Sequence, residues 1–492
     1  MIYNFSTGRM RLNTLTILYI LLLPILIFFF TRGVITHDEG YILNSSWKML
    51  SGIMPYRDFH FVYTPGSLFL TTLSFALFGV SILSSRILML FIAVASIALI
   101  YGIIVKATNN RLYAVIAILI FVAWGPTHIN FSWPVMYAIF TGLLTSYLLM
   151  KFLETRQARF LYFSGISAFL VFVAKQNFGV VFIAPVFIFF LTKSSRQVKY
   201  LLNFLTGYIW GIIGFLLYLL NASSFGPFFS DLYFFTIKRI LINDALTTHF
   251  IYKDHFIPMI FRTGFYLLIP FVCIATLILL YTRRRFHLLF LPTFVLLFYI
   301  VGIRPTTDYI HLVPLLSLIG IPIVLYLRFN IYTMLRYLIL VFSLILIVVG
   351  FHTALYKGYY RWDTPLITHN YFLNNDRIHI FTNEKFYYEF NDMIATTSRY
   401  TKDEDYIFVN SYNPLLYFIT NRREPVKNNY LTTEINPKEY YEEMVGNLVA
   451  KKIKLVILDH KSIQNLPVKK FINDNYYFLK TIQDFDIYIL KP

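Results

Sequence analysis

Two adjacent carboxylates, Asp38 and Glu39, follow directly after the first membrane-length apolar run, in the tetrapeptide His37-Asp38-Glu39-Gly40. Ionisable residues at such a place are costly in a membrane protein and often mark chemistry or ion handling. A carboxylate within hydrogen-bond reach of a hydroxyl can act as a general base for group transfer to that hydroxyl. Asp38 and Glu39 are therefore the candidate catalytic residues. The alternative is that Asp38 only caps the helix that follows it.

Candidate substrate-binding side chains follow in the same loop and at the ends of later apolar runs. Arg57 suits phosphate, although a salt bridge with Asp58 that only organises the loop is an equal alternative. Taken singly, a cation at the end of a span usually extends to the interface. Several cations on one side of the membrane could together hold a phosphate or pyrophosphate headgroup. The remaining candidates are Tyr63, Arg86, Lys175, Gln176, Arg304 and His311, with loop shaping the alternative for Tyr63 and core packing for His311.

A divalent metal ion is a weaker hypothesis for the same loop. His37, Asp38, Glu39 and His60 carry side chains that bind such ions. Their spacing matches no strict ligand motif. The sequence therefore specifies no certain cofactor.

The composition is that of an integral membrane protein. The chain has 492 residues, of which 57% are hydrophobic and 14% are charged. Its net charge of +18 is uneven: residues 1–351 hold 25 basic and 8 acidic side chains, and residues 352–492 hold 18 and 17. The basic excess thus belongs to short loops between apolar runs, where it sets topology, and gives no signal for nucleic-acid binding. The single cysteine, Cys273, excludes an intramolecular disulfide.

The elements that must position the candidate residues are mostly membrane helices. Twelve apolar runs lie between residues 15 and 351, and the run at 66–80 is short. The basic loops fall on one side of the membrane only if this run does not cross it fully. We therefore predict a mainly α, polytopic bundle with eleven full spans and one partial or re-entrant helix. The N-terminus is expected to be cytoplasmic, and residues 1–351 form the catalytic module.

Residues 352–492 are expected to form a small extracytoplasmic α/β domain. Strand patterns occupy Asp405–Asn410, Lys454–Asp459 and Asp486–Leu490, and Pro437–Lys452 has the charge pattern of a helix. In the outer loop 34–65, residues Tyr41–Leu50 have helical spacing and should lie along the membrane interface.

The order of motifs in the first ninety residues resembles the GT-C superfamily of membrane glycosyltransferases. Asp38-Glu39 is followed by an interfacial helix, by Pro55-Tyr56-Arg57-Asp58-Phe59 and by Tyr63-Thr64-Pro65-Gly66. A short apolar run then ends at Phe78-Gly79, and Arg86 opens a long span. The layout is most similar to the bacterial branch of protein O-mannosyltransferase-like enzymes and lipid A aminoarabinose transferases.

This resemblance implies transfer of a sugar, a hexose or a pentose, from a polyprenyl-phosphate-linked donor to an acceptor hydroxyl on the extracytoplasmic face. It implies Asp38 as the acceptor-side base, Arg86 and Lys175 as contacts of the lipid phosphate, and a location in the bacterial cytoplasmic (inner) membrane. The sequence departs from the lipid A branch, which carries Lys-Pro-Pro where this chain has Tyr63-Thr64-Pro65. The acceptor, whether lipid, glycan or protein, is therefore not implied, because fold does not fix function.

Two other classes of protein stay open. A transporter or flippase of lipid-linked glycans would carry ionisable residues near mid-membrane on broken helices, with inverted repeats. Here the acids occupy loops and span ends, and no repeat is evident. The other alternative is a non-catalytic envelope scaffold whose outer domain binds a partner.

Overall fold

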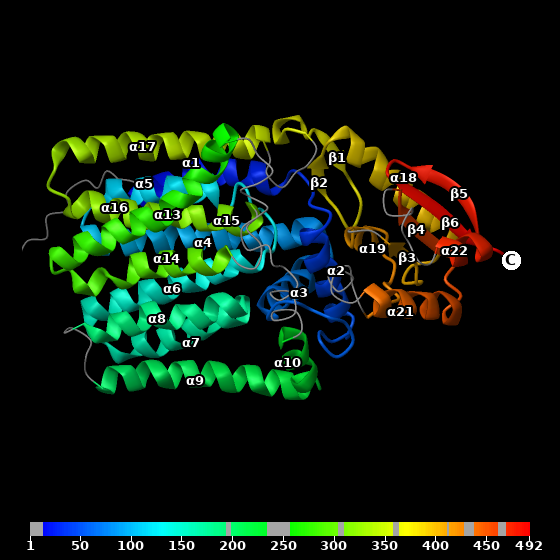
Figure 1. Ribbon diagram of the computed structural model, residues 1–492, viewed down its shortest axis with the longest axis horizontal. Coiled ribbons are helices and arrows are strands. Elements are labelled where there is room, and N and C mark those ends of the chain that lie inside the picture. The colour runs from blue at the N-terminus through cyan, green and yellow to red at the C-terminus, as the bar shows by residue number, and fades with distance from the viewer. Residues whose placement is uncertain are drawn as a thin grey trace, which may run out of the picture.

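The protein is a helical bundle with a small sheet domain at one end, as the computed structural model in Figure 1 shows. The structure describes residues 13–192, 198–233, 256–303, 309–357, 364–410, 413–427, 437–460 and 469–492. The bundle helices run side by side along the longest axis (Figure 1). They are α1 (Thr14–Phe30), α4 (Ile82–Thr108), α5 (Arg111–Trp124), α6 (Pro134–Thr155), α7 (Ala158–Ala174), α8 (Gln176–Leu191), α9 (Val198–Asn221), α13 (Phe256–Thr282), α14 (Phe290–Gly302), α15 (Tyr309–Leu316), α16 (Gly320–Phe329) and α17 (Thr333–His352).

The bundle has the apolar character that a bilayer requires. Within the described residues, five helical segments are long and apolar enough to cross a membrane by length and composition, and seven shorter apolar helices accompany them. Exposed apolar side chains such as Trp210 on α9 and Leu344 on α17 cover the outside, while a continuous hydrophobic core fills the inside. This arrangement confirms the predicted polytopic helical bundle, and the number of full spans stays a prediction.

Three shorter helices lie at the end of the bundle that faces the sheet domain: α2 (Asp38–Leu50), α3 (Gly66–Phe78) and α10 (Phe225–Tyr233). Helix α3 is the short apolar run of the sequence. Its 13 residues span only about 20 Å at the usual rise of a helix, against about 30 Å for a hydrocarbon core. That length is consistent with a helix that does not cross the membrane.

The C-terminal region builds two sheets. The strands β1 (Tyr371–Leu373) and β2 (Ile380–Thr382) form an antiparallel pair. The strands β3 (Phe408–Asn410), β4 (Leu455–Asp459), β5 (Tyr476–Ile482) and β6 (Phe485–Leu490) form a sheet of order β3-β4-β6-β5 in which only β3 and β4 are parallel. The helices are α18 (Glu384–Tyr400), α19 (Leu415–Ile419), α21 (Pro437–Ala450) and α22 (Lys469–Asn475).

The three predicted strands and the predicted helix of this region are present, with bounds that differ by up to three residues. Strands β1, β2 and β5 and helix α18 were not predicted. Strand β5 has exposed side chains along most of its length, so its sequence lacks the buried alternation that marks a strand. The division into domains at residue 351 stays a prediction.

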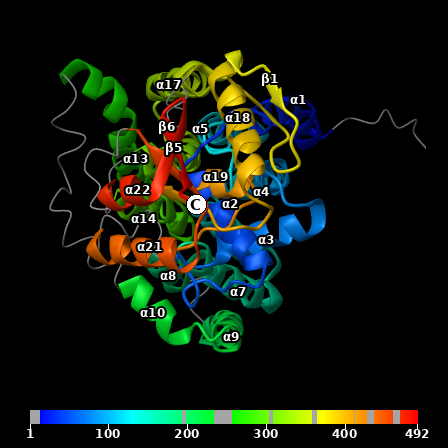
Figure 2. The same ribbon diagram turned by 90° about the vertical axis from the view of Figure 1, so that its right-hand side faces the viewer.

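The sheet domain packs directly on the part of the chain between α1 and α4. Residues of α2, α3 and α4 share one hydrophobic cluster with residues of α18, α19 and the larger sheet. Figure 2 looks onto this end of the molecule and shows α19 next to α2 near its centre. At Gly40, a Cβ atom would lie 2.5 Å from the backbone nitrogen of Leu415, so only glycine allows this close approach. Gly40, the last residue of the tetrapeptide His37-Asp38-Glu39-Gly40, is thus a position where α19 contacts α2 closely.

Candidate active site

Asp38 is the first residue of α2 and is partly exposed. The residues from Glu39 to Trp47 are all buried, so Asp38 lies at the edge of the packed region. The capping position falls on His37, whose side chain makes no capping hydrogen bond. A carboxylate in the first turn is stabilised by the helix dipole. The alternative that Asp38 serves as the helix cap therefore finds no support in the geometry.

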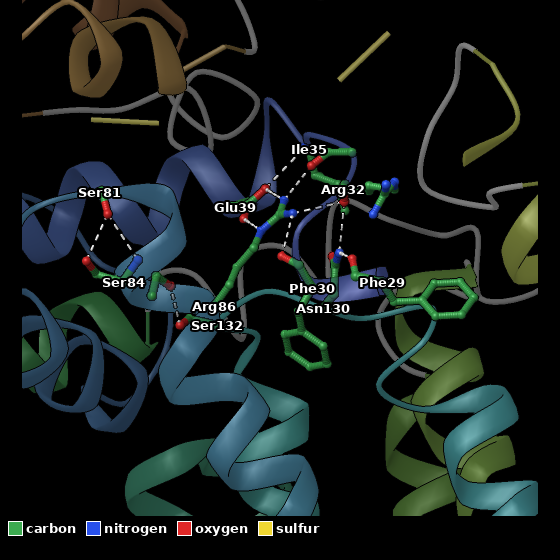
Figure 3. Close-up of polar contacts among 12 residues, drawn as sticks. Phe29, Phe30, Arg32, Ile35, Glu39, Ser81, Ser84, Arg86, Asn130 and Ser132 are labelled. Atoms are coloured by element: carbon green, nitrogen blue, oxygen red, sulfur yellow. Dashed lines mark hydrogen bonds and ion pairs between the residues drawn. The ribbon is translucent and has the colours of Figure 1, made fainter. Parts of the chain in front are cut away.

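Glu39 and Arg86 form a buried ion pair, shown in Figure 3. Arg86 Nε donates to Glu39 Oε1 at 2.7 Å, and Arg86 Nη2 donates to Glu39 Oε2 at 2.7 Å. Their side chains are 0% and 1% exposed, respectively. Arg86 comes from the first turns of α4, and its fork geometry matches the carboxylate as a bidentate pair.

The remaining N–H groups of Arg86 bind the chain that leaves α1. Arg86 Nη1 donates to the carbonyls of Phe30 and Arg32 at 3.3 and 2.9 Å, and Nη2 donates to the carbonyl of Gly33 at 2.7 Å. All five donors of this guanidinium are therefore in use. We expected Arg86 to contact a lipid phosphate, and here the structure differs, because it leaves that side chain neither a free donor nor an exposed surface.

The pair instead fixes the path between α1 and α2. Glu39 Oε2 also accepts a hydrogen bond from the backbone N–H of Ile35 at 3.2 Å. Asn130, from the loop between α5 and α6, donates to the carbonyls of Phe29 and Arg32. The segment that carries Asp38 is thus held by α4 and by the loop between α5 and α6. Glu39, predicted as a catalytic residue, has both carboxylate oxygens committed to this framework.

Lys175 lies among aromatic rings at the junction of α7 and α8. Its ammonium nitrogen is 5.5 Å from the ring centre of Tyr63, 5.8 Å from that of Trp133 and 5.2 Å from that of Phe178. Lys175 is only 4% exposed. Trp133 also makes edge contacts with Tyr63 and with His311 at 5.7 and 6.3 Å between ring centres. The structure therefore brings three predicted residues, Lys175, Tyr63 and His311, around one tryptophan.

Gln176 binds backbone rather than an open space. Its amide donates to the carbonyl of Val62 at 3.0 Å and accepts from the N–H of Thr64 at 3.2 Å. Close beside it, a Cβ at Gly66 would lie 2.5 Å from the carbonyl oxygen of Val173. Gln176 and Gly66 thus fasten the loop that carries Tyr63 to the end of α7.

Arg57 and Asp58 form a local pair away from this cluster. Arg57 donates from Nε and Nη2 to the Asp58 carboxylate at 2.9 and 2.7 Å. Asp58 also accepts from the N–H of Met54, and the hydrogen bond from Arg57 is the main reason that its pKa lies below its ordinary value. The Arg57 side chain is 42% exposed. This geometry agrees with the loop-organising alternative for both residues.

The helical spacing of α2 indicates which way Asp38 faces. Residues three positions apart share a helix face, and Tyr41, three positions after Asp38, stacks on Phe61 with ring centres 5.4 Å apart. The Tyr41 hydroxyl also bonds the backbone of the same loop at His60 and Val62. Asp38 thus lies on the face of α2 that looks toward the loop leading to Tyr63 and Lys175.

The sheet domain reaches the same end of α2. Burial lowers the pKa of His37 below its ordinary value, and the negative charge of Asp459, at the end of β4, opposes that shift. His37 is therefore mainly a neutral imidazole beside Asp38. The carboxyl end of β4 lies close enough to act electrostatically on the start of α2.

Known proteins resemble this chain in structure. The crystal structure of ArnT from Cupriavidus metallidurans bound to undecaprenyl phosphate superimposes with a TM-score of 0.60 at 12% identity, covering 96% of this chain and 98% of that one. The apo state of the same protein gives 0.55 at 11% identity, over 96% and 97% of the two chains. The chain shares the fold of ArnT over nearly its full length. No protein-family model matches the sequence, and no curated protein matches it either.

Two other predictions on the site concern Arg304 and a metal ion. Arg304 lies outside the described residues. Among the residues that the structure describes, no group of three or more His, Cys, Asp or Glu side chains is placed to hold a metal ion. The predicted metal candidates His37, Asp38 and Glu39 do not form such a group, and Glu39 is bound to Arg86.

Sequence reasoning missed two residues that shape the site, Asn130 and Trp133. Both are buried in the outer loop Asn130-Phe-Ser-Trp133-Pro. The indole nitrogen of Trp133 has no hydrogen-bond partner among the described residues. A polar and aromatic loop between two spans, on the side of the acidic pair, was the available signal. It was overlooked because neither residue carries a charge.

Proposed function

We propose that the protein is a glycosyltransferase that moves a sugar, a hexose or a pentose, from a polyprenyl-phosphate-linked donor to an acceptor hydroxyl. The observation that carries the proposal is the combination of a GT-C fold with a carboxylate, Asp38, that is held at the start of α2 by the buried Glu39–Arg86 pair. ArnT, whose structure was solved with undecaprenyl phosphate, has the same fold. We further propose that the site faces the extracytoplasmic side of a bacterial inner membrane.

In this proposal Asp38 is the acceptor-side base. The acceptor oxygen attacks the anomeric carbon of the donor sugar, and its proton passes to the Asp38 carboxylate. The bond between the anomeric carbon and the phosphate oxygen breaks, and the polyprenyl phosphate leaves with the electron pair. Positive groups that face the leaving phosphate stabilise the charge that develops on it. A phosphate leaving group is already anionic, so it needs no general acid.

Lys175 is the cation proposed for the donor phosphate. It is buried at the end of α7, on the side of the bundle toward which the Asp38 face of α2 looks. The indole N–H of Trp133 lies in the same cluster and is a donor without a partner among the described residues. A buried ammonium and a buried N–H suit an anionic oxygen, because charge interactions strengthen where water is excluded.

The test is to identify the lipid that accumulates when the gene is deleted. We expect mass spectrometry of the deletion strain to show a polyprenyl-phosphate-linked sugar that disappears when the wild-type gene is restored. Restoration with Asp38→Asn should leave the lipid in place, whereas Asp484→Asn, at an exposed ion pair of the sheet domain, should remove it. Vesicles that contain the purified protein distinguish a glycosyltransferase from a transporter. Movement of the lipid-linked sugar across the bilayer with no transfer to any acceptor would contradict the proposal.

A further inference from the structure

A polar cavity lies between α2 and the sheet domain, apart from Asp38 and Lys175. Its volume is about 310 Å³. One wall is a single face of α2, and the other is formed by residues 423–427 together with α21 and Tyr406. That face carries Asn44, Trp47 and Lys48, whose spacing of three and four places them on one side of a helix, and Ser51 follows at the C-cap of α2. Neither Asp38 nor Lys175 is among the residues that line the cavity.

The cations of this cavity are mostly satisfied by the protein. Lys48 pairs with Glu424 at 2.5 Å, with both side chains nearly buried, and Arg423 pairs with Glu404 at 2.5 Å. The ammonium of Lys451 donates to a backbone carbonyl at 2.9 Å. Three of the four cations that line the cavity thus already have acceptors. An anionic ligand would have to compete with these partners.

The carboxylates of the cavity are satisfied as well. Asp58 is bound by Arg57, and Glu424 accepts from Lys48. Glu443 accepts from the backbone N–H of Lys427 at 2.5 Å. A cationic ligand therefore finds no stranded negative charge. The walls favour a ligand that is polar and uncharged.

One buried acceptor in the cavity is left without a donor. Asn44 is 3% exposed, and its amide nitrogen donates to Glu424 at 3.0 Å. Its amide oxygen has no hydrogen-bond partner among the described residues. Buried polar atoms are rarely left unpaired in folded proteins. A hydroxyl group from a ligand would supply the missing donor.

Aromatic rings complete the lining. Trp47, Phe59 and Tyr406 line the cavity, and Tyr406 is 38% exposed. A sugar ring presents an apolar face of C–H groups and an edge of hydroxyls, so it matches the exposed part of Tyr406 beside one unpaired acceptor and several paired charges. The volume is at the lower end of the range of about 300–1,000 Å³ for small-molecule sites, which suits a sugar or a short oligosaccharide.

We propose that this cavity is an accessory subsite for neutral carbohydrate, which holds part of the acceptor glycan away from the hydroxyl that reacts. This inference rests on the proposed function for its biological meaning. The cavity wall also touches the loop of the candidate active site, because the carbonyl of Lys427 accepts from the N–H of His60 at 3.3 Å. The acceptor would thus span the gap between the sheet domain and α2.

Binding is tested without any donor, on the full-length protein in lipid nanodiscs. The probes are neutral trisaccharides of glucose, galactose and mannose, a trisaccharide that contains a uronic acid, and inorganic phosphate. Saturation-transfer NMR gives a dissociation constant for each. We expect at least one neutral trisaccharide to bind, and we expect Tyr406→Ala and Asn44→Leu to weaken that binding at least tenfold.

The matched control is Tyr477→Ala. Tyr477 is another exposed tyrosine of the sheet domain with a lysine over its ring, and it does not line the cavity. Equal binding in the Tyr406 and Tyr477 variants would overturn the inference, as would binding of phosphate alone or of no neutral trisaccharide. Tyr406→Ala tests the cavity even where Asn44→Leu fails to fold, since Tyr406 is partly exposed.

A transfer assay then separates this inference from the proposed function. Tyr406→Ala should raise KM for an oligosaccharide acceptor and leave the rate with a monosaccharide acceptor unchanged. An equal effect on both acceptors would contradict the subsite. A protein that binds the trisaccharide in the cavity but transfers no sugar would refute the proposed function and leave the binding site standing.

Discussion

The buried Glu39–Arg86 pair allows a quantitative test of whether Arg86 organises the site or binds the donor phosphate. Arg86→Met removes all five hydrogen bonds of the guanidinium and leaves the Glu39 carboxylate buried without its partner. Stranding a buried charge costs about 3–5 kcal/mol. The three carbonyls that lose a donor add roughly 1 kcal/mol each. We therefore expect the free energy of unfolding to fall by about 6–8 kcal/mol.

The double variant Glu39→Met with Arg86→Met gives the sharper result. It strands no charge, so only the three carbonyls and the N–H of Ile35 lose partners, which costs about 4 kcal/mol. Glu39→Met alone strands the guanidinium and should cost about 3–5 kcal/mol. The second substitution should therefore partly rescue the protein that carries Arg86→Met.

The measurement is a denaturant titration in mixed micelles, followed by circular dichroism, for the wild type and the three variants. Lys106→Met is the control, because Lys106 pairs with an exposed Glu154 and should contribute no more than about 1 kcal/mol. Donor binding is measured in parallel by native mass spectrometry. If Arg86→Met unfolded like the wild type but lost donor affinity, Arg86 would be a phosphate ligand and the structural reasoning would be wrong.

Three further predictions concern the base, a buried acid and Gly40. Asp38→Asn should lower the transfer rate by about 10²–10⁴-fold, the usual contribution of a general base, whereas Asp484→Asn, at an exposed ion pair, should stay close to the wild type. An Asp38→Asn variant that keeps a tenth of the rate would remove Asp38 from this role. Burial raises the pKa of Glu389 to about 7 from an ordinary value of 4.5. The folded state then retains its proton while the unfolded state releases it, so the wild type loses stability as the pH rises from 4.5 through 7. The difference in unfolding free energy between Glu389→Gln and the wild type should therefore shift in favour of the variant from pH 4 to pH 8, by up to about 3 kcal/mol. Equal denaturation midpoints of the two proteins at both pH values would contradict this. Gly40→Ala should loosen α19 from α2, because the new Cβ meets the Leu415 backbone, and should make the sheet domain more sensitive to protease. Gly446→Ala is the control: this position in α21 has open space around it, so digestion should be unchanged.

Local patterns in the sequence were enough to predict the helical bundle, the short helix and part of the sheet domain. These patterns depend only on residues that are close in the sequence. The apolar runs form helices, the short run at 66–80 forms α3, and the strand pattern at 454–459 forms β4. The predicted start of α2, at Tyr41, lies three residues after the start in the structure, at Asp38. Helical spacing was recognised from Tyr41, but the helix begins at Asp38, because the polar first turn carries no apolar periodicity.

The partners of the candidate residues could not be read from the sequence. Arg86 lies 47 positions from Glu39, and its charge and location fit a phosphate ligand as well as a structural pair. The choice depends on burial, which only the packing of α1, α2 and α4 decides. Arg57 and Asp58 were easier to interpret, since adjacent residues of opposite charge can pair locally. Trp133 was missed because an uncharged residue gives no electrostatic signal.

The contact between the exit of α1 and the sheet domain bears on how the protein is made. Gly33 donates its N–H to the carbonyl of Phe381, and Phe381 donates to the carbonyl of Thr31, so the first outer segment is paired with β2 near the other end of the chain. At ordinary rates of synthesis, β2 emerges roughly 20–70 s after the segment that it pairs with. Throughout that interval the segment that carries Asp38 lacks the backbone partner that β2 supplies. A nascent chain that ends after α17 therefore holds the start of α2 only through contacts of the bundle itself, such as the Glu39–Arg86 pair.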